Sequence, residues 1–416
     1  MKVAMPVGVF PTPTETWIPA QMVHLISLGV DLAVFGAPAA PGSVHPIVEQ
    51  NRLMDRVVFR RRSPRGRIRR VLQGPLVALT APDVDRLAML GCLNGFRFGW
   101  HLVASGALPL IGESILRRYR HHQPDLIHCH DALVGAAIAP LYELGALRAP
   151  LILTAHGPDL LEARHVQIAG GYKLLAAHTH TLTVGSMFMR NRAIGLGFDP
   201  ARIVVIPQGT TTDDWPFRER TIAPGAPVTI VCVGRHTAFK GYEFAIDAFA
   251  IIRLRFPGSR LILIGNGPMH VQLKARAASL GLADYIDFPG ILTRDRLVPV
   301  LDRAHIFLHP GIHTDDNQVE AQGVVLQEAQ ACGLPVVATD VGGIPESVAR
   351  DRSALIVPSR DARALADALS RLLSNPSQWP EMGRAGRNLV KLRFEMSTVA
   401  DRLFKLYQAV LAQSRG

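Results

Sequence analysis

The stretch from Glu320 to Glu346 constrains the fold of this chain more than any other. It reads EAQGVVLQEAQACGLPVVATDVGGIPE. A helix running through Gly323 and the valine pair after it would start poorly, so we expect a loop to about Val325 and then a short helix to Cys332. Gly333 follows where the end of a helix favours positive φ. The run Pro335–Thr339 is short and apolar, which is typical of a buried parallel strand.

Two glutamates in this stretch are separated by seven residues. Glu320 is predicted to lie on the loop and Glu328 in the short helix. Between them, Gly323, Val324 and Val325 bring backbone N–H groups to the start of the helix, a position that attracts anions. The arrangement predicts a site for a phosphate-bearing ligand with a carboxylate on each side.

A second group of candidate residues follows a predicted strand at Pro227–Val233. The strand ends at Gly234 and Arg235, and a loop then leads to Lys240 and a helix over 243–256. The next strand is predicted at Arg260–Ile264. It is followed by the turn Gly265-Asn266-Gly267-Pro268, in which glycine and proline are typical turn residues.

The chain begins with a β-loop-α-β pattern that is typical of a doubly wound parallel sheet. We expect a strand at Val3–Phe10, a helix at Trp17–Leu28 and a strand at Val30–Phe35. Further strands are predicted at Asp125–Cys129, Pro150–Thr154, Thr181–Val184, Ile203–Ile206, Ile286–Gly290 and Ile306–Pro310, and helices at 361–373 and 395–412.

Histidines gather at the ends of two strands in the first half of the chain. His156 comes just after the strand Pro150–Thr154, where open α/β sheets bind their ligands. His128, His130 and Asp131 cluster around the end of another strand. We expect His128 and His130 to lie on opposite faces of that strand, and therefore predict no metal site there. Asp315 and Asp316 are predicted to be solvated.

The charge of the chain points to an acidic partner. The 45 basic and 34 acidic residues give a net charge of +11, which suits nucleic acid, anionic lipid or a phosphorylated substrate. The stretch Arg56–Arg70 carries eight arginines. An anionic membrane surface is favoured over nucleic acid as its partner, and a solvated loop is nearly as well supported as the membrane.

Cysteine usage and hydropathy indicate the cellular compartment of the protein. The four cysteines are scattered without a CxxC pair, which argues against a disulfide framework or a zinc site and favours a reducing compartment. The N-terminus is predicted to be a strand and not a signal peptide, and no apolar run is long enough to span a membrane. We therefore expect a cytoplasmic protein. Peripheral attachment to the inner face of the membrane is compatible with this expectation.

Several motifs together resemble retaining glycosyltransferase family 4. They are the E-x7-E pattern of Glu320 and Glu328, the GLPVVAT and GGIPE segments after it, and the G-R-x5-K-G pattern from Gly234 to Gly241. The FPTPTETWIPAQ segment resembles the colanic-acid and amylovoran biosynthesis type. The resemblance implies a GT-B fold of two doubly wound, Rossmann-like domains facing a cleft. These would be residues 1–215 and 216–394, with a helix at 395–416 that packs back on the first domain.

The resemblance also implies an activity and residue roles. The activity is transfer of a sugar, with retention, from a nucleotide-sugar donor to a saccharide or lipid-linked acceptor in surface polysaccharide biosynthesis, without metal or other cofactor. Glu320, His156, Arg235 and Lys240 are the implied catalytic residues. The implied donor-binding residues are Glu328, Gly234, Arg235, Lys240, Gly265, Gly267, Gly323, Val324 and Val325.

Other classes of function stay open at this level. One is a noncatalytic subunit that binds a sugar nucleotide within a polysaccharide assembly complex. Another is a basic nucleic-acid-binding protein, although no nucleic-acid-binding fold accompanies the arginines. An inverting or phosphorolytic enzyme of the same fold is a further alternative, and phosphorolysis would need a pyridoxal cofactor.

Overall fold

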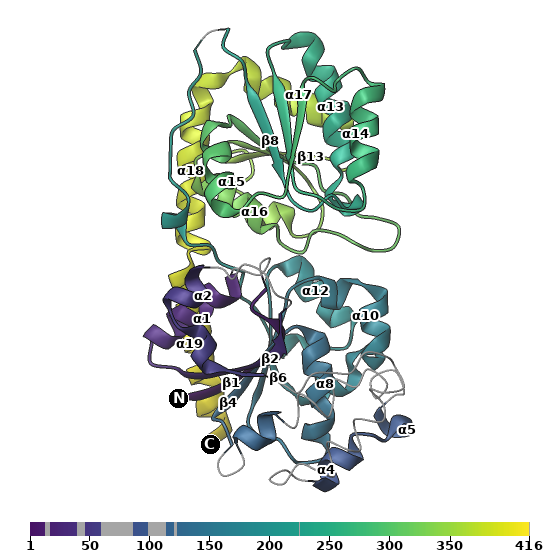
Figure 1. Cartoon of the computed structure of the whole chain (residues 1–416), viewed down its shortest axis with the longest axis vertical. Coiled ribbons are helices and arrows are strands. Elements are labelled where there is room, and N and C mark those ends of the chain that lie inside the picture. Colours follow the sequence, from purple (N-terminus) through teal and green to yellow (C-terminus); the bar gives the residue numbers. More distant parts are fainter. Residues whose placement is uncertain are drawn as a thin grey trace. The chain divides into compact units, whose positions relative to one another are not determined.

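The computed structural model describes residues 1–12, 17–39, 46–59, 86–98, 114–119, 123–223 and 225–415. The chain divides into two compact units (Figure 1). Unit 1 consists of Met1–Ile206 and Val399–Gly416, and unit 2 consists of Pro207–Thr398. The division therefore falls before the predicted domain boundary at residue 215, and the last helix joins unit 1 from Val399 onward.

Unit 1 contains, among its described residues, a parallel seven-stranded sheet in the order β3-β2-β1-β4-β5-β6-β7. The strands are β1 (Lys2–Phe10), β2 (Asp31–Pro38), β3 (Val57–Phe59), β4 (Leu126–His130), β5 (Leu151–Ala155), β6 (Thr179–Val184) and β7 (Ile203–Val205). The helices are α1 (Trp17–Ser27), α2 (Pro46–Gln50), α4 (Arg86–Gly91), α5 (Gly95–Phe98), α8 (Ala132–Glu143), α9 (Pro158–Leu161), α10 (Ala163–Ile168), α11 (Lys173–His178) and α12 (Met187–Gly195).

Unit 2 has a six-stranded parallel sheet in the order β10-β9-β8-β11-β12-β13 over its described residues. The strands are β8 (Thr229–Val233), β9 (Arg260–Ile264), β10 (Ile286–Gly290), β11 (Ile306–His309), β12 (Val336–Thr339) and β13 (Ala354–Val357). The helices are α13 (Tyr242–Arg255), α14 (His270–Ser279), α15 (Arg294–Arg303), α16 (Val324–Ala331), α17 (Ala362–Ser374) and α18 (Trp379–Arg393); α19 (Met396–Arg415) then continues into unit 1.

Both sheets are doubly wound, because in each the strand order reverses beside the first strand of the unit. In unit 2 the strands are buried on both faces. Ile230 and Cys232 of β8 pack in one core and Val231 packs in the other. Burial on both faces explains why these strands are continuously apolar in the sequence, and the predicted α/β fold class is confirmed.

Helix α19 completes the core of unit 1. Val399, Leu403, Tyr407 and Val410 recur at helical spacing and pack with the apolar residues of β1 and β2. Figure 1 shows this last helix running beside β1 and β4. The Tyr407 hydroxyl also lies 2.5 Å from Nδ1 of His128 on β4.

Two of the sequence predictions are wrong, and several elements were not predicted, helices α8 and α15 among them. The Arg56–Arg70 stretch is not a loop throughout, because Val57–Phe59 forms the edge strand β3, paired with β2; residues 60–70 lie outside the described residues. His128 and His130 were expected on opposite faces of their strand. Residues two positions apart share a face, and the two ring centroids are 4.4 Å apart. Strand β13 and helix α18 were not predicted.

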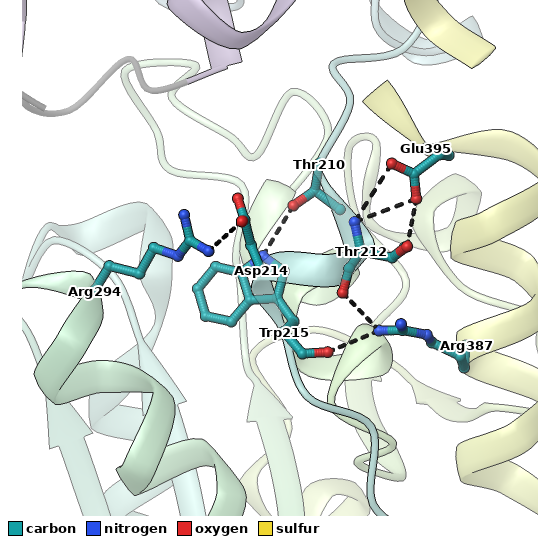
Figure 2. A network of polar contacts seen from close by, with 7 residues as sticks. All are labelled: Thr210, Thr212, Asp214, Trp215, Arg294, Arg387 and Glu395. Atoms are coloured by element: carbon teal, nitrogen blue, oxygen red, sulfur yellow. Dashed lines mark hydrogen bonds and ion pairs between the residues drawn. The ribbon is translucent and has the colours of Figure 1, made fainter. Parts of the chain in front are cut away.

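The segment that enters unit 2 is bound to the segment that leaves it (Figure 2). Thr210 and residues 394–396 form a short parallel bridge, with the Thr210 N–H donating to the Phe394 carbonyl at 2.8 Å and the Met396 N–H to the Thr210 carbonyl at 3.0 Å. The Glu395 carboxylate accepts hydrogen bonds from the backbone N–H of Thr212 at 3.2 Å and from its hydroxyl at 2.5 Å.

Arg387 of α18 also binds this segment (Figure 2). One guanidinium nitrogen donates to the carbonyls of Thr212, Trp215 and Ala331 at 2.8–2.9 Å. All three residues are buried, so water cannot replace the Arg387 guanidinium as the donor to their carbonyls unless the packing opens.

We expect Arg387→Met to destabilise unit 2. Three buried carbonyls would lose a charged donor, which costs about 2–4 kcal/mol and lowers the melting temperature of this unit by on the order of 5–10 °C. The matched control is Arg384→Met on the same helix, whose exposed ion pair with Glu219 contributes about 0–1 kcal/mol. Calorimetry that gave the two variants equal melting temperatures would contradict this account.

Candidate functional site

The loop after β8 packs its backbone directly on the turn after β9. The Gly234 N–H donates to the Ile264 carbonyl at 3.0 Å, and the His236 N–H to the Asn266 carbonyl at 2.9 Å. A Cβ on Gly265 would lie 1.9 Å from the Gly234 carbonyl oxygen, and one on Gly267 would lie 2.6 Å from that of His236. Close contact between the two backbones therefore requires glycine at 265 and 267, independently of any ligand.

Lys240 lies at the end of this loop and contacts Glu320, the first residue of the Glu320–Glu346 stretch. The ammonium of Lys240 and the carboxylate of Glu320 form a short ion pair. Only 11% of the Lys240 side chain and 13% of the Glu320 side chain are exposed. Lys240 is therefore largely buried, whereas Arg235 on the same loop is exposed.

His309, the last residue of β11, completes this cluster of three side chains. Its Nε2 lies 3.3 Å from the Glu320 oxygen that Lys240 also contacts. Sequence reasoning did not single out His309, and the only signal was a polar residue at the end of an otherwise apolar strand. The cluster thus brings together the carboxyl ends of β8 and β11, where ligands bind in this class of sheet.

The surroundings decide which of these groups are charged. Burial alone would raise the pKa of the Glu320 carboxyl, but Lys240 and His309 outweigh it and hold that pKa well below its usual range. Burial lowers the pKa of His309. At neutral pH the cluster therefore consists of an ammonium, a carboxylate and a neutral imidazole.

Glu328 lies in a different electrostatic setting on α16. Burial raises its pKa to about 7, although Arg294 and Lys240 favour its charged form. Arg294 is ion-paired with Asp214 and lies over the Trp215 ring, at 5.6 Å from the ring centre. Near neutral pH, Glu328 is therefore a carboxyl group that can exist in either form.

The start of α16 has the geometry that the sequence predicts. The helix begins at Val324, and Gly323 before it has a φ of 86°. Val324 and Val325 are half-buried. Gly343 donates its N–H to the Glu320 carbonyl at 2.9 Å, so the GGIPE segment also holds the backbone of the first glutamate of the E-x7-E pattern.

In unit 1, His156 is held by a residue that sequence reasoning missed. The buried carboxylate of Asp159 accepts the backbone N–H of His156 at 3.1 Å, of Gly157 at 2.8 Å and of Ala132 at 3.0 Å. These bonds tie the loop after β5 to the start of α8. An acid three residues after a histidine, at the start of a helix, was the available signal.

The His156 ring stacks on His130, with Nε2 of His156 3.0 Å from Nδ1 of His130. His128 contacts Thr154 at 2.6 Å as well as Tyr407, and burial lowers the pKa of His128 to about 3. Burial also lowers the pKa of His130, so His128 and His130 are neutral near pH 7. No cluster of three or more metal-ligating side chains occurs in the part of the chain that the structure describes.

The predicted acidic pair lies apart from these clusters. Asp315 pairs with Arg360 at 3.2 Å, and Asp316 accepts hydrogen bonds from Thr314 and Gln318. Within the described ranges, no helix is long and apolar enough to cross a membrane.

Two family models match this chain in succession. "Glycosyltransferase Family 4" matches residues 20–214 and "Glycosyl transferases group 1" matches residues 213–389. The seam between the two matches coincides with the segment that leads into unit 2.

Named relatives share much of the length. The amylovoran biosynthesis glycosyltransferase AmsK of Erwinia amylovora is 27% identical over 96% of this chain and 97% of its own. A GDP-mannose-dependent alpha-(1-6)-phosphatidylinositol monomannoside mannosyltransferase of Mycobacterium tuberculosis is 31% identical over 71% of this chain and 78% of its own.

Among solved structures, Anabaena HepE in complex with UDP and glucose has a TM-score of 0.71 with 17% identity, over 98% of this chain and all of HepE. That likeness shows the GT-B fold. Taken with the two family models and the 31% identical relative, it shows that this chain belongs to the group 1 and family 4 glycosyltransferases.

Proposed function

We propose that this glycosyltransferase transfers a sugar from a nucleotide-sugar donor with retention of configuration, and that it does so without a metal ion. The acceptor is a saccharide or a lipid-linked saccharide of a surface polysaccharide or exopolysaccharide. The observation that carries this proposal is the ion pair of Lys240 with Glu320 at the carboxyl ends of β8 and β11.

The proposed chemistry requires opposite charges next to each other. When the bond from the anomeric carbon to the diphosphate breaks, negative charge grows on the leaving phosphate and positive charge grows on the sugar. Lys240 and the exposed Arg235 would stabilise the phosphate, and the ionised Glu320 would orient the sugar hydroxyls and stabilise the positive carbon. His156 is assigned to contact with the donor sugar, as the resemblance to the family implies.

Two cations on one loop suit a reaction without a metal ion. A divalent ion would neutralise the same phosphate oxygens that Arg235 and Lys240 can contact. The acceptor hydroxyl would then attack on the face that the diphosphate leaves and pass its proton to the leaving phosphate oxygen, so no protein nucleophile is needed.

Glu328 suits a part of the donor that does not react. A carboxylate accepts hydrogen bonds from two neighbouring hydroxyls, which is the arrangement of a ribose. Its place on α16, eight positions after Glu320 in the sequence, would set the distance between the ribose and the sugar. We therefore assign Glu328 to ground-state binding of the donor.

The acceptor class rests on the relatives and on the charge of the chain. AmsK is named for amylovoran biosynthesis and the mycobacterial relative for a phosphatidylinositol mannoside. Lipid-linked acceptors lie at a membrane, and the eight arginines of Arg56–Arg70 would attract its anionic headgroups. Peripheral attachment on the cytoplasmic side follows as part of the proposal.

A donor screen tests the proposal as a whole. Sugars linked to UDP, GDP, ADP and dTDP are added in excess chelator, and release of nucleoside diphosphate is followed. A true donor at a hundredfold excess over its Kd should stabilise the protein by about 2.7 kcal/mol and be turned over. Glu320→Gln should keep the thermal shift and lose turnover. Binding without turnover by the wild type would identify a noncatalytic subunit, and recovery only on adding Mg²⁺ would refute the metal-independent chemistry.

Arg235 allows a cleaner test of diphosphate stabilisation than Lys240. Arg235→Ala removes an exposed cation, so kcat should fall by about 10²-fold with an unchanged melting temperature. Lys240→Ala also leaves Glu320 buried without its cation, which costs about 3–5 kcal/mol, and both activity and stability should fall. Arg296→Ala, which removes an exposed arginine of α15, is the control. Wild-type kcat in Arg235→Ala would remove Arg235 from the mechanism.

The raised pKa of Glu328 predicts opposite effects of pH on donor binding and on stability. Below about pH 7 the carboxyl gains a proton and loses acceptor capacity, so KM for the donor should rise several-fold between pH 8 and pH 6. The stability that this group contributes is fully present below its unfolded pKa of 4.5 and is lost as pH rises through about 7.

Glu328→Gln should therefore have a high, pH-independent KM and be more stable than the wild type at pH 8, by on the order of 2 kcal/mol. The difference in stability should shrink towards pH 5. Steady-state kinetics and thermal unfolding at three pH values measure both effects, with Glu381→Gln, an exposed carboxyl of α18, as control. A KM that rises equally in wild type and Glu328→Gln would contradict the assignment.

A further inference from the structure

His309 is fully buried at the end of β11, with 0% of its side chain exposed. Neither ring nitrogen makes a well-directed hydrogen bond to another described residue. Among the described residues, the ring has one ion-pair contact, which joins its Nε2 to a carboxylate oxygen of Glu320 at 3.3 Å. Burying an imidazole with so little compensation costs stability, so its contact with Glu320 calls for a functional explanation.

The ring of His309 is held in place by packing. It lies parallel to the Phe307 ring at 6.4 Å, and a Cβ on Gly311 would come within 3.8 Å of its Cδ2 atom. Both neighbours belong to β11 or to the loop after it. Because the ring is fully buried, a change in its position requires the residues around it to move as well.

Lys240, the other partner of Glu320, is on a loop and has a second role under the proposed function. Its ammonium would have to contact the leaving diphosphate while the reaction proceeds. An ammonium shared between a carboxylate and a phosphate stabilises each less than it would alone. The Glu320 carboxylate would then be held least firmly at the moment when its orientation matters.

We propose that His309 is a positioning residue that keeps the Glu320 carboxylate oriented and ionised while Lys240 binds the diphosphate of the donor. The neutral imidazole would carry its proton on Nε2 and direct it at the carboxylate oxygen. The role rests on the proposed function, since it assumes that Lys240 is drawn to a diphosphate and that Glu320 faces the sugar.

The groups that face Glu320 come from three elements. They are Lys240 from the loop after β8, His309 from β11 and Tyr242 from α13, whose pKa is raised first by its burial and also by the Glu320 charge. Because burial lowers the pKa of His309, the imidazole stays neutral near pH 7. A pH effect of changing His309 would therefore report on Glu320.

The test compares His309→Leu, which removes the donor, with His309→Gln, which keeps an N–H group. In His309→Leu, kcat should fall by about tenfold or more with KM for the donor within about twofold. The acid limb of the kcat–pH profile should move up by about one pH unit. His309→Gln should restore most of kcat. His305→Gln, at the other end of β11 and bonded to the Thr229 N–H, is the control that should leave the profile unchanged.

An overlap of the His309→Leu and wild-type pH profiles would overturn the positioning role. So would equal losses of kcat and melting temperature in the Leu and Gln variants, because that result describes a purely structural residue.

A second measurement keeps the test independent of turnover. In protein labelled with ¹³C-glutamate, the carboxyl signal of Glu320 is identified by its loss in Glu320→Gln and followed from pH 3 to pH 8, alone and with UDP or GDP. The midpoint of its titration should lie at a higher pH in His309→Leu than in the wild type, most clearly with the nucleotide bound. An unmoved midpoint would refute the role of His309 even if the donor screen fails, whereas a moved midpoint with a failed screen would refute only the proposed function.

Discussion

The buried ion pair of Lys240 with Glu320 is the interaction on which the site of unit 2 depends. Removing two charges from water costs several kcal/mol for each, and the attraction between them offsets that cost only when the geometry is good. Breaking such a pair leaves an uncompensated charge and costs about 3–5 kcal/mol. The pair therefore fixes the loop after β8 relative to the E-x7-E stretch, although 80 positions of sequence separate the two residues.

The same loop is fixed on its other side without any side-chain charge. Gly234 and His236 make backbone hydrogen bonds to Ile264 and Asn266, and the approach is so close that Gly265 and Gly267 cannot carry a Cβ. A comparable contact occurs in unit 1. There the Asp159 carboxylate joins the loops after β4 and β5 and fixes the backbone of His156. In both units, loops at the carboxyl ends of neighbouring strands are bound to one another.

The sequence predicted the elements well because buried parallel strands are continuously apolar and end at glycine or a polar turn. The helix at 324–331 after Gly323 and the strand at 336–339 follow from such local signals. The burial of Lys240 could not be predicted in this way, since its partner is distant in the sequence. His309 was not predicted as a site residue because a single histidine at a strand end is a common feature. Strand β3 was not predicted because its three residues lie beside a run of arginines.

Several of the buried polar atoms without hydrogen-bond partners within the described ranges lie at or near this loop in unit 2. They include His236 Nε2, the Tyr242 hydroxyl and both nitrogens of His309. Each costs about 1–3 kcal/mol when left unsatisfied, and a fold selected for stability alone would replace them with apolar groups. Together with the raised pKa of Glu328, they mark the end of this sheet as a place where stability is given up for polar groups that can act on a ligand. The cores on either face of the same sheet, in contrast, are filled with apolar side chains.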